Sequence, residues 1–201
     1  MPLSELRPEW RPIKAWIFDL DNTLISNPLD FDEIRRALRM PSEGGDILGF
    51  IRAMTPTAQL EANQVLEDIE AAASARSEAL PGAVKLLRYL ASQADVRLGV
   101  LSRNHQKAME IGLNAAGMAG VFNREYILSR EHCPPKPDPA GINQLLTAWN
   151  IKPEEAVMVG DFHHDLYAGR NAGVKTILVR DEPEWPDAWD FHCTCLSELF
   201  V

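Results

Sequence analysis

The sequence predicts an α/β protein with a parallel sheet and a helical segment inserted after its first strand. Short apolar runs of strand length alternate along most of the chain with stretches whose apolar residues recur at helical spacing. After the first strand, by contrast, about 50 residues show helical patterns alone. With 201 residues, 46% of them hydrophobic, the chain can form one sizeable core, or a core and a small second domain.

The alternating elements define the predicted core. Strands are expected at residues 15–18, 97–101, 126–128, 156–159, 175–179 and 191–195. Helices are expected at residues 83–92, 106–118, 139–149 and 165–172, with a last helical turn from Ser197. Strands that are joined through helices pair in parallel with right-handed crossovers. We therefore predict a Rossmann-like three-layer core made of residues 1–26 and 81–201.

Residues 27–80 are predicted to form a small all-helical domain. Ile34 and Leu38 lie on one face of a short helix, and a second apolar stripe runs through residues 47–54. A loop at residues 40–45 separates these two helices. A third helix is expected over residues 56–80, with packing residues Leu60, Val65 and Ile69. Insertions at the end of a strand can close over a site, so we interpret this segment as a cap.

Charge and cysteine content narrow the classes of partner. The formal charge is −9, from 20 Lys and Arg against 29 Asp and Glu, which argues against nucleic acid or an anionic membrane as the main partner. A small phosphorylated ligand stays possible, because a bound metal reverses the local field. Three cysteines, no apolar signal core and no run of about 18 apolar residues favour a cytoplasmic location. The oligomeric state cannot be predicted from the sequence.

Two carboxylates stand at the end of the first predicted strand. Asp19 and Asp21 follow the apolar residues 16–18, and ligands of α/β sheets bind where parallel strands end. Two unpaired carboxylates would repel each other, so a bound cation, a shared proton or a chemical role is expected. The alternative is that an Asp after a strand only forms a turn or caps a helix.

Three further polar clusters lie at comparable places. Residues 102–104 (Ser-Arg-Asn) follow the second strand, Lys136 precedes a helix, and Asp161 and Asp165 follow the strand at 156–159. In a parallel sheet these clusters would meet at one edge. Carboxylates hold Mg²⁺, which neutralises phosphate oxygens so that a carboxylate can attack phosphorus. A lysine and a hydroxyl then hold the charge of the transferring group. The set predicts phosphoryl transfer.

With these four clusters in this order, the chain resembles the haloacid dehalogenase superfamily of phosphatases. The resemblance covers residues 15–197 apart from the cap, and is to members with a cap between the first and second motifs, with a leaning towards the phosphoglycolate-phosphatase-like branch. It implies a Mg²⁺-dependent hydrolase of small phosphorylated metabolites that works through an aspartyl-phosphate.

The resemblance also implies roles for the residues around the phosphoryl group. Asp19 would be the nucleophile. Asp21 would protonate the leaving alcohol and then activate water, which favours a phosphate ester over a carbon–halogen bond. Ser102 would hydrogen-bond the phosphoryl group, helped by the backbone N–H groups of Leu20 and Arg103.

The remaining implied roles concern the lysine and the metal. Lys136 would bridge the nucleophile and the phosphate. Asp161 would bind Mg²⁺ together with Asp19 and the backbone carbonyl of Asp21. Asp165 would be a weaker or outer ligand and a partner of Lys136.

Several polar residues have two interpretations each. Arg103 and Asn104 contact substrate, or Asn104 only caps the next helix. His163 and His164 touch substrate or metal-bound water, or are solvated loop residues. The basic residues of the first cap helix guide an anionic substrate or form a solvated face; they are Arg35, Arg36 and Arg39.

Two other functions are compatible with the same core. One is a phosphomutase, which needs a cap that holds a sugar phosphate in two orientations and keeps water out. The other is a non-catalytic phosphate-binding or regulatory protein. The intact acids and lysine argue against the second, since loss of any one of them would abolish turnover.

Overall fold

The computed structural model describes residues 5–41 and 45–201, and within them six parallel strands form one sheet in the order β3-β2-β1-β4-β5-β6. The strands are β1 (Ala15–Phe18), β2 (Arg97–Leu101), β3 (Ile127–Leu128), β4 (Ala156–Gly160), β5 (Lys175–Val179) and β6 (Phe191–Cys193). The predicted parallel α/β sheet is confirmed. The chain returns to the middle of the sheet after β3, so β1 lies between β2 and β4.

Helices cover both faces of the sheet. Side chains alternate along β1, so Trp16 and Phe18 face one side and Ala15 and Ile17 the other. The first face packs on α4 (Ala83–Ala91) and α5 (Gln106–Ala115), and the second on α6 (Ala140–Trp149) and α7 (His163–Ala172). Short 3₁₀ turns occur at Pro8–Trp10, Arg124–Tyr126, Pro153–Glu155 and Leu196–Leu199. The three-layer core is therefore the predicted one.

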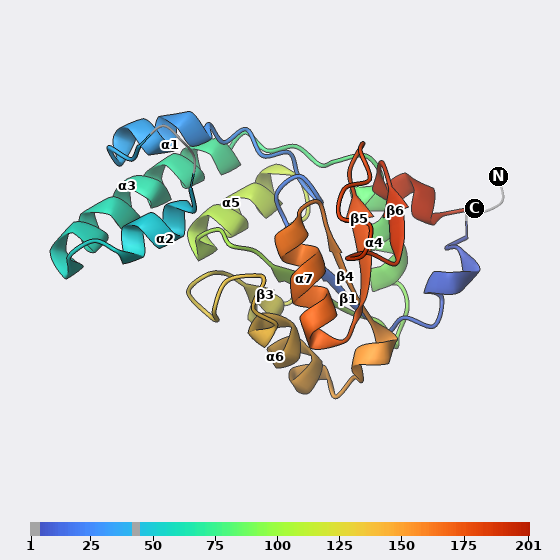
Figure 1. The fold of residues 1–201 in the computed structure, drawn as a ribbon. Helices are drawn as coiled ribbons and strands as arrows, with labels where there is room; N and C mark the ends of the chain where they lie inside the picture. Colours follow the sequence, from blue (N-terminus) through green and yellow to red (C-terminus); the bar gives the residue numbers. More distant parts are fainter. Residues whose placement is uncertain (1–4, 42–44) are drawn as a thin grey trace.

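Three helices between β1 and α4 pack on one another beside the sheet, at the left of Figure 1. They are α1 (Phe31–Ala37), α2 (Ile47–Arg52) and α3 (Pro56–Ser74). They share a separate apolar cluster, whose buried members are Ile34, Leu38, Ile51, Ala62 and Leu66. The loop predicted at residues 40–45 lies partly outside the described residues. The division of the chain into core and cap stays a prediction.

The third helix of this segment ends earlier than predicted. α3 stops at Ser74, whereas the apolar pattern predicted helix to residue 80. The chain then becomes extended, with the Ser26 N–H donating to the Glu78 carbonyl at 2.8 Å and the Leu80 N–H to the Leu24 carbonyl at 2.9 Å. Pairing with residues that are distant in sequence therefore replaces the last helical turns.

The predicted packing face of α3 was partly wrong. Leu60 and Val65 are 74% and 38% exposed, while Ile69 is half-buried against the cluster. The face that the helix buries carries small residues, one leucine and one acid, namely Ala62, Leu66, Glu70, Ala73 and Ser74. Hydrophobicity alone did not reveal this face, because Glu70 is buried only through a basic partner, as described below.

Two further expectations from the sequence concern the cysteines and membrane-spanning helices. All three cysteines are free, and burial raises the pKa of Cys193 to about 12. In the parts of the chain that the structure describes, no helix combines the length and the apolar character needed to cross a lipid bilayer.

Gly82, at the start of α4, stands where any larger residue should destabilise the fold. Its φ is +87°, and an added Cβ would lie 2.2 Å from the backbone nitrogen of Ser197. We expect Gly82→Ala to lower the free energy of unfolding by about 2–4 kcal/mol, measured by urea denaturation.

Gly117→Ala is the matched control, because Gly117 also has a positive φ, +71°, but no atom lies within 4 Å of the added Cβ. It should cost only the left-handed conformation, about 1–2 kcal/mol. Equal losses in the two variants would contradict the close contact at Ser197.

Candidate active site

The polar clusters predicted from the sequence meet at the carboxyl edge of the sheet. Phe18, the last residue of β1, is in register with Val100 of β2 and Val159 of β4. The three strands therefore end at nearly the same level, and the loops that follow them start beside one another. The strand order thus brings Asp19, Ser102 and Asp161 to one place.

A buried lysine joins two of the carboxylates. The Lys136 Nζ lies 2.5 Å from Asp19 Oδ1 and 2.5 Å from Asp165 Oδ1, and all three residues are buried. Burial by itself would lower the pKa of Lys136, but the carboxylates of Asp165 and Asp19 raise it above its ordinary value. Burial raises the pKa of Asp19, and the Lys136 charge opposes this. The lysine is therefore charged and holds Asp19 in place.

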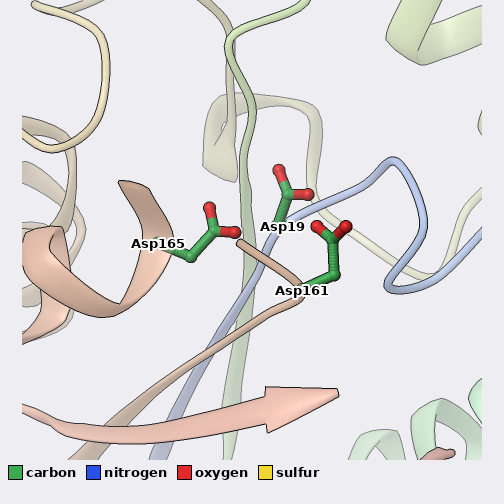
Figure 2. A group of neighbouring side chains, drawn as sticks. All are labelled: Asp19, Asp161 and Asp165. Carbon is green, nitrogen blue, oxygen red and sulfur yellow. The ribbon is translucent and has the colours of Figure 1, made fainter. Parts of the chain in front are cut away.

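Three carboxylates form a candidate metal site. Asp19, Asp161 and Asp165 each offer an oxygen, and these oxygens lie within 4.8 Å of one another (Figure 2). Burial, followed by the charge of Asp165, raises the pKa of Asp161 to about 7, and a cation would relieve both effects. An all-oxygen donor set fits Mg²⁺. The Asp21 carboxylate is outside this group; the sequence predicted a contribution from its backbone carbonyl instead.

Both oxygens of Asp165 already have partners. Oδ1 contacts Lys136, and Oδ2 accepts the Phe162 N–H at 3.1 Å at the start of α7. For the Asp161 carboxylate, by contrast, no hydrogen bond or ion pair is found among the described residues, and the outer role of Asp165 stays a prediction.

Asp21 is held by an amide from the neighbouring loop. The Asn104 Nδ2 donates to Asp21 Oδ2 at 3.2 Å, and the Asn104 backbone N–H donates to Ser102 Oγ at 3.0 Å. Burial raises the pKa of Asp21 to about 6, although the Asn104 amide opposes this. A carboxyl group with this pKa can exchange a proton near neutral pH.

The capping interpretation of Asn104 was wrong. His105 is the N-cap residue of α5, and its ring accepts the Lys107 N–H at 3.3 Å. Asn104 instead orients Asp21. Substrate contact by Asn104 and Arg103 stays a prediction.

A cavity of about 680 Å³ opens above these groups. It is lined by every predicted site residue except Leu20, whose side chain is buried beneath it. Arg35 lines the cavity, whereas Arg36 is exposed on α1 and Arg39 is exposed after the helix has ended, so the prediction that Arg39 lies on this helix was wrong. The helices supply the other wall, made of Leu29, Phe31, Ile34, Asp46, Ile47, Leu48, Leu66 and Glu70. The sequence analysis did not single out most of this wall.

His163 and His164 lie in the first turn of α7 and line the cavity, so their interpretation as loop residues was wrong. α7 begins two residues earlier than predicted. Burial, then the charges of Arg103 and His163, lowers the pKa of His164 to about 4. Burial also lowers the pKa of His163. Both rings are therefore neutral near neutral pH.

Ion pairs tie the three helices to the loops of the sheet. Arg103 Nη2 lies 2.5 Å from Asp46 Oδ1 at the start of α2. Arg130 Nη1 lies 2.7 Å and 2.9 Å from the two oxygens of Glu70 on α3; Glu70 is buried and the Arg130 side chain is 10% exposed. The Arg130 backbone N–H donates to the Asn104 carbonyl at 3.3 Å. The helical segment is thus joined to the loop that contains Asn104, whose side chain hydrogen-bonds Asp21.

Comparison with known proteins finds hydrolases of one family. A family model of haloacid dehalogenase-like hydrolases matches residues 43–179. An uncharacterized hydrolase of Saccharomyces cerevisiae is 33% identical over 171 residues, which cover 84% of this chain and 78% of the yeast protein.

Two solved structures share the fold. A predicted phosphoglycolate phosphatase from Haemophilus somnus gives a TM-score of 0.73 at 18% identity, covering 94% of this chain and 96% of the other. CbbY from Rhodobacter sphaeroides, solved with xylulose-1,5-bisphosphate, gives 0.74 at 22% identity and covers 92% and 96% of the two chains.

Removing only Arg130 from its pair with Glu70 should destabilise the protein more than removing both charges. Arg130→Met would leave the Glu70 carboxylate buried without its cation, so we expect a loss of about 3–5 kcal/mol in the free energy of unfolding. Arg130→Met combined with Glu70→Gln should recover a large part of it, as urea denaturation of the four proteins of the cycle would show.

Lys14→Met is the matched control, since it removes one partner of the surface pair Lys14–Glu155. Its cost should be below about 1 kcal/mol. An Arg130→Met variant as stable as Lys14→Met would show that the Glu70 charge does not depend on Arg130.

Proposed function

The chain belongs to the haloacid dehalogenase-like hydrolase family, and from this we propose that it is a Mg²⁺-dependent phosphomonoester hydrolase. The observation that carries the proposal is that one cavity contains Asp19, paired with Lys136, together with the carboxylates of Asp21 and Asp161. The substrate would be a small phosphorylated metabolite. The name of the Haemophilus somnus structure, a predicted phosphoglycolate phosphatase, supports this class.

In the first step, an oxygen of Asp19 attacks phosphorus and forms an aspartyl-phosphate, while the bond from phosphorus to the alcohol oxygen breaks. Asp21 gives its proton to that oxygen, so a neutral alcohol leaves. The Lys136 ammonium and the Ser102 hydroxyl, with the N–H groups of Leu20 and Arg103, hold the charge on the phosphoryl oxygens.

In the second step, Asp21 takes a proton from water as the water oxygen attacks phosphorus. The bond to Asp19 breaks and inorganic phosphate leaves. Held by Asp19, Asp161, the backbone carbonyl of Asp21 and, more loosely, Asp165, Mg²⁺ would supply positive charge to the phosphate oxygens.

The helical segment would act as the cap. Residues 27–80 contribute one wall of the cavity and are held over it by the pairs at Arg103 and Arg130. Such a cover excludes bulk water and selects the leaving group.

The proposal is tested by phosphate release from a panel of phosphorylated metabolites and an aryl phosphate, with Mg²⁺ and with a chelator. Release should require Mg²⁺, and Asp19→Asn should lower kcat/KM by at least about 10³-fold because an amide is not a nucleophile. Asparagine keeps the size of the side chain, so the variant should fold.

Release that survives Asp19→Asn would rule out this nucleophile. A sugar-phosphate isomer in place of free phosphate would indicate a mutase.

The role of Asp21 predicts a dependence on the leaving group. Asp21→Asn should lower kcat/KM about 10²–10⁴-fold for an alkyl phosphate, whose alkoxide needs a proton. For p-nitrophenyl phosphate the loss should be far smaller, because that phenolate leaves unprotonated. Equal losses for both esters would argue against Asp21 as the general acid.

A further inference from the structure

Two phenylalanine side chains are exposed inside the candidate active-site cavity. Phe31 is 49% exposed and Phe162 is 39% exposed, and both line the cavity that contains Asp19. Exposed aromatic side chains in a concave site commonly contact a ligand, because each leaves apolar surface in water that a ligand would cover. The exposed Leu60 and Val65 of α3, by contrast, are not part of the cavity lining.

The two rings come from different parts of the fold, Phe31 from the helical segment and Phe162 from the loop after β4. Phe31 is the first residue of α1, whose N-cap Asp30 accepts the Asp32 N–H at 2.8 Å. Phe162 directly follows Asp161, and its ring packs edge-on against Trp185 with the ring centres 5.2 Å apart. The packed Phe162 ring therefore loses little conformational freedom when it binds a ligand.

Several charged side chains of the cavity lining, outside the group of Asp19, Asp21, Lys136, Asp161 and Asp165, form ion pairs. Arg35 pairs with Asp32 at 2.9 Å, and Arg103 pairs with Asp46. Arg180 pairs with Glu184, and Glu70 with Arg130. Among the described residues, the buried Nε atoms of Arg35 and Arg103 have no hydrogen-bond partner, so these pairs still leave donors for a polar group of the substrate.

The remaining wall is apolar. The helical segment contributes aliphatic side chains, which are Leu29, Ile34, Ile47, Leu48 and Leu66. A cavity of about 680 Å³ also exceeds what a two-carbon phosphate ester needs, and lies in the range of pockets for ring-sized ligands.

We propose that the substrate is a monophosphate ester of an alcohol that bears a planar ring, with the ring packed against Phe31 and Phe162. This inference rests on the proposed phosphatase function and names its substrate class. The phosphate lies at Asp19 and Lys136, and the ring lies toward the helical segment.

The test compares 2-phenylethyl phosphate with ethyl phosphate, two esters of primary alcohols that differ in the ring. The wild-type kcat/KM should be at least about tenfold higher for the ring-bearing ester, the scale of burying additional apolar surface. Ribose 5-phosphate, which is polar and of similar size, should be a poorer substrate than 2-phenylethyl phosphate.

Phe31→Ala and Phe162→Ala should each lower the ratio of the two kcat/KM values by severalfold, mainly through KM. Leu60→Ala is the control, because this exposed residue lies outside the cavity lining, and its ratio should equal that of the wild type. A wild-type ratio near one, or alanine variants with an unchanged ratio, would overturn the proposal.

Calorimetry with non-hydrolysable analogues separates this failure from a failure of the proposed function. With Mg²⁺ present, 3-phenylpropylphosphonate should bind at least about tenfold more tightly than ethylphosphonate. Preferred ring binding without turnover of any ester would overturn only the phosphatase proposal. Turnover without any ring preference would overturn only the substrate class.

Discussion

The contact of the Lys136 ammonium with Asp19 and Asp165 is the interaction on which the candidate site depends. Carboxylates cluster at the end of β1 and β4, and burial disfavours their charged forms. The carboxylates also repel one another. The buried Lys136 ammonium lies 2.5 Å from both Asp19 and Asp165, so it offsets part of this repulsion and holds the two side chains in position. Because Lys136 approaches from a loop after β3, the site exists only when distant segments of the chain are assembled.

The sheet and two local features make this contact possible. β1 lies between β2 and β4, so the loops that carry Asp19, Ser102 and Asp161 start side by side. At Gly160 an added Cβ would lie 2.3 Å from the Cβ of Asp165, so the glycine leaves room for that acid. The Phe162 N–H then fixes Asp165 at the start of α7. Backbone geometry and side-chain chemistry therefore agree at this edge of the sheet.

The helical segment connects substrate recognition with the chemistry proposed for the core. It lines one wall of the cavity, and the buried pair Arg130–Glu70 joins it to the loop of Asn104, whose amide holds Asp21. Movement of the segment would therefore shift the Asn104 amide that hydrogen-bonds Asp21, the proposed general acid. The same segment contributes aliphatic side chains to the cavity, including Leu29, Ile47 and Leu48, opposite the carboxylates at the end of the sheet.

Local sequence was sufficient to predict the alternation of strands and helices, the parallel sheet and the carboxylates at its edge. Those features follow from short apolar runs and from the polar residues that directly succeed them, as at Asp19 and Asp161. The face of α3, the role of Asn104 and the ring-lined cavity were decided by the tertiary structure. Glu70 is buried because Arg130, 60 residues away, neutralises it, and Asn104 points to Asp21, 83 residues away. Contacts between residues so far apart in sequence leave no local periodicity, so only the folded chain reveals them.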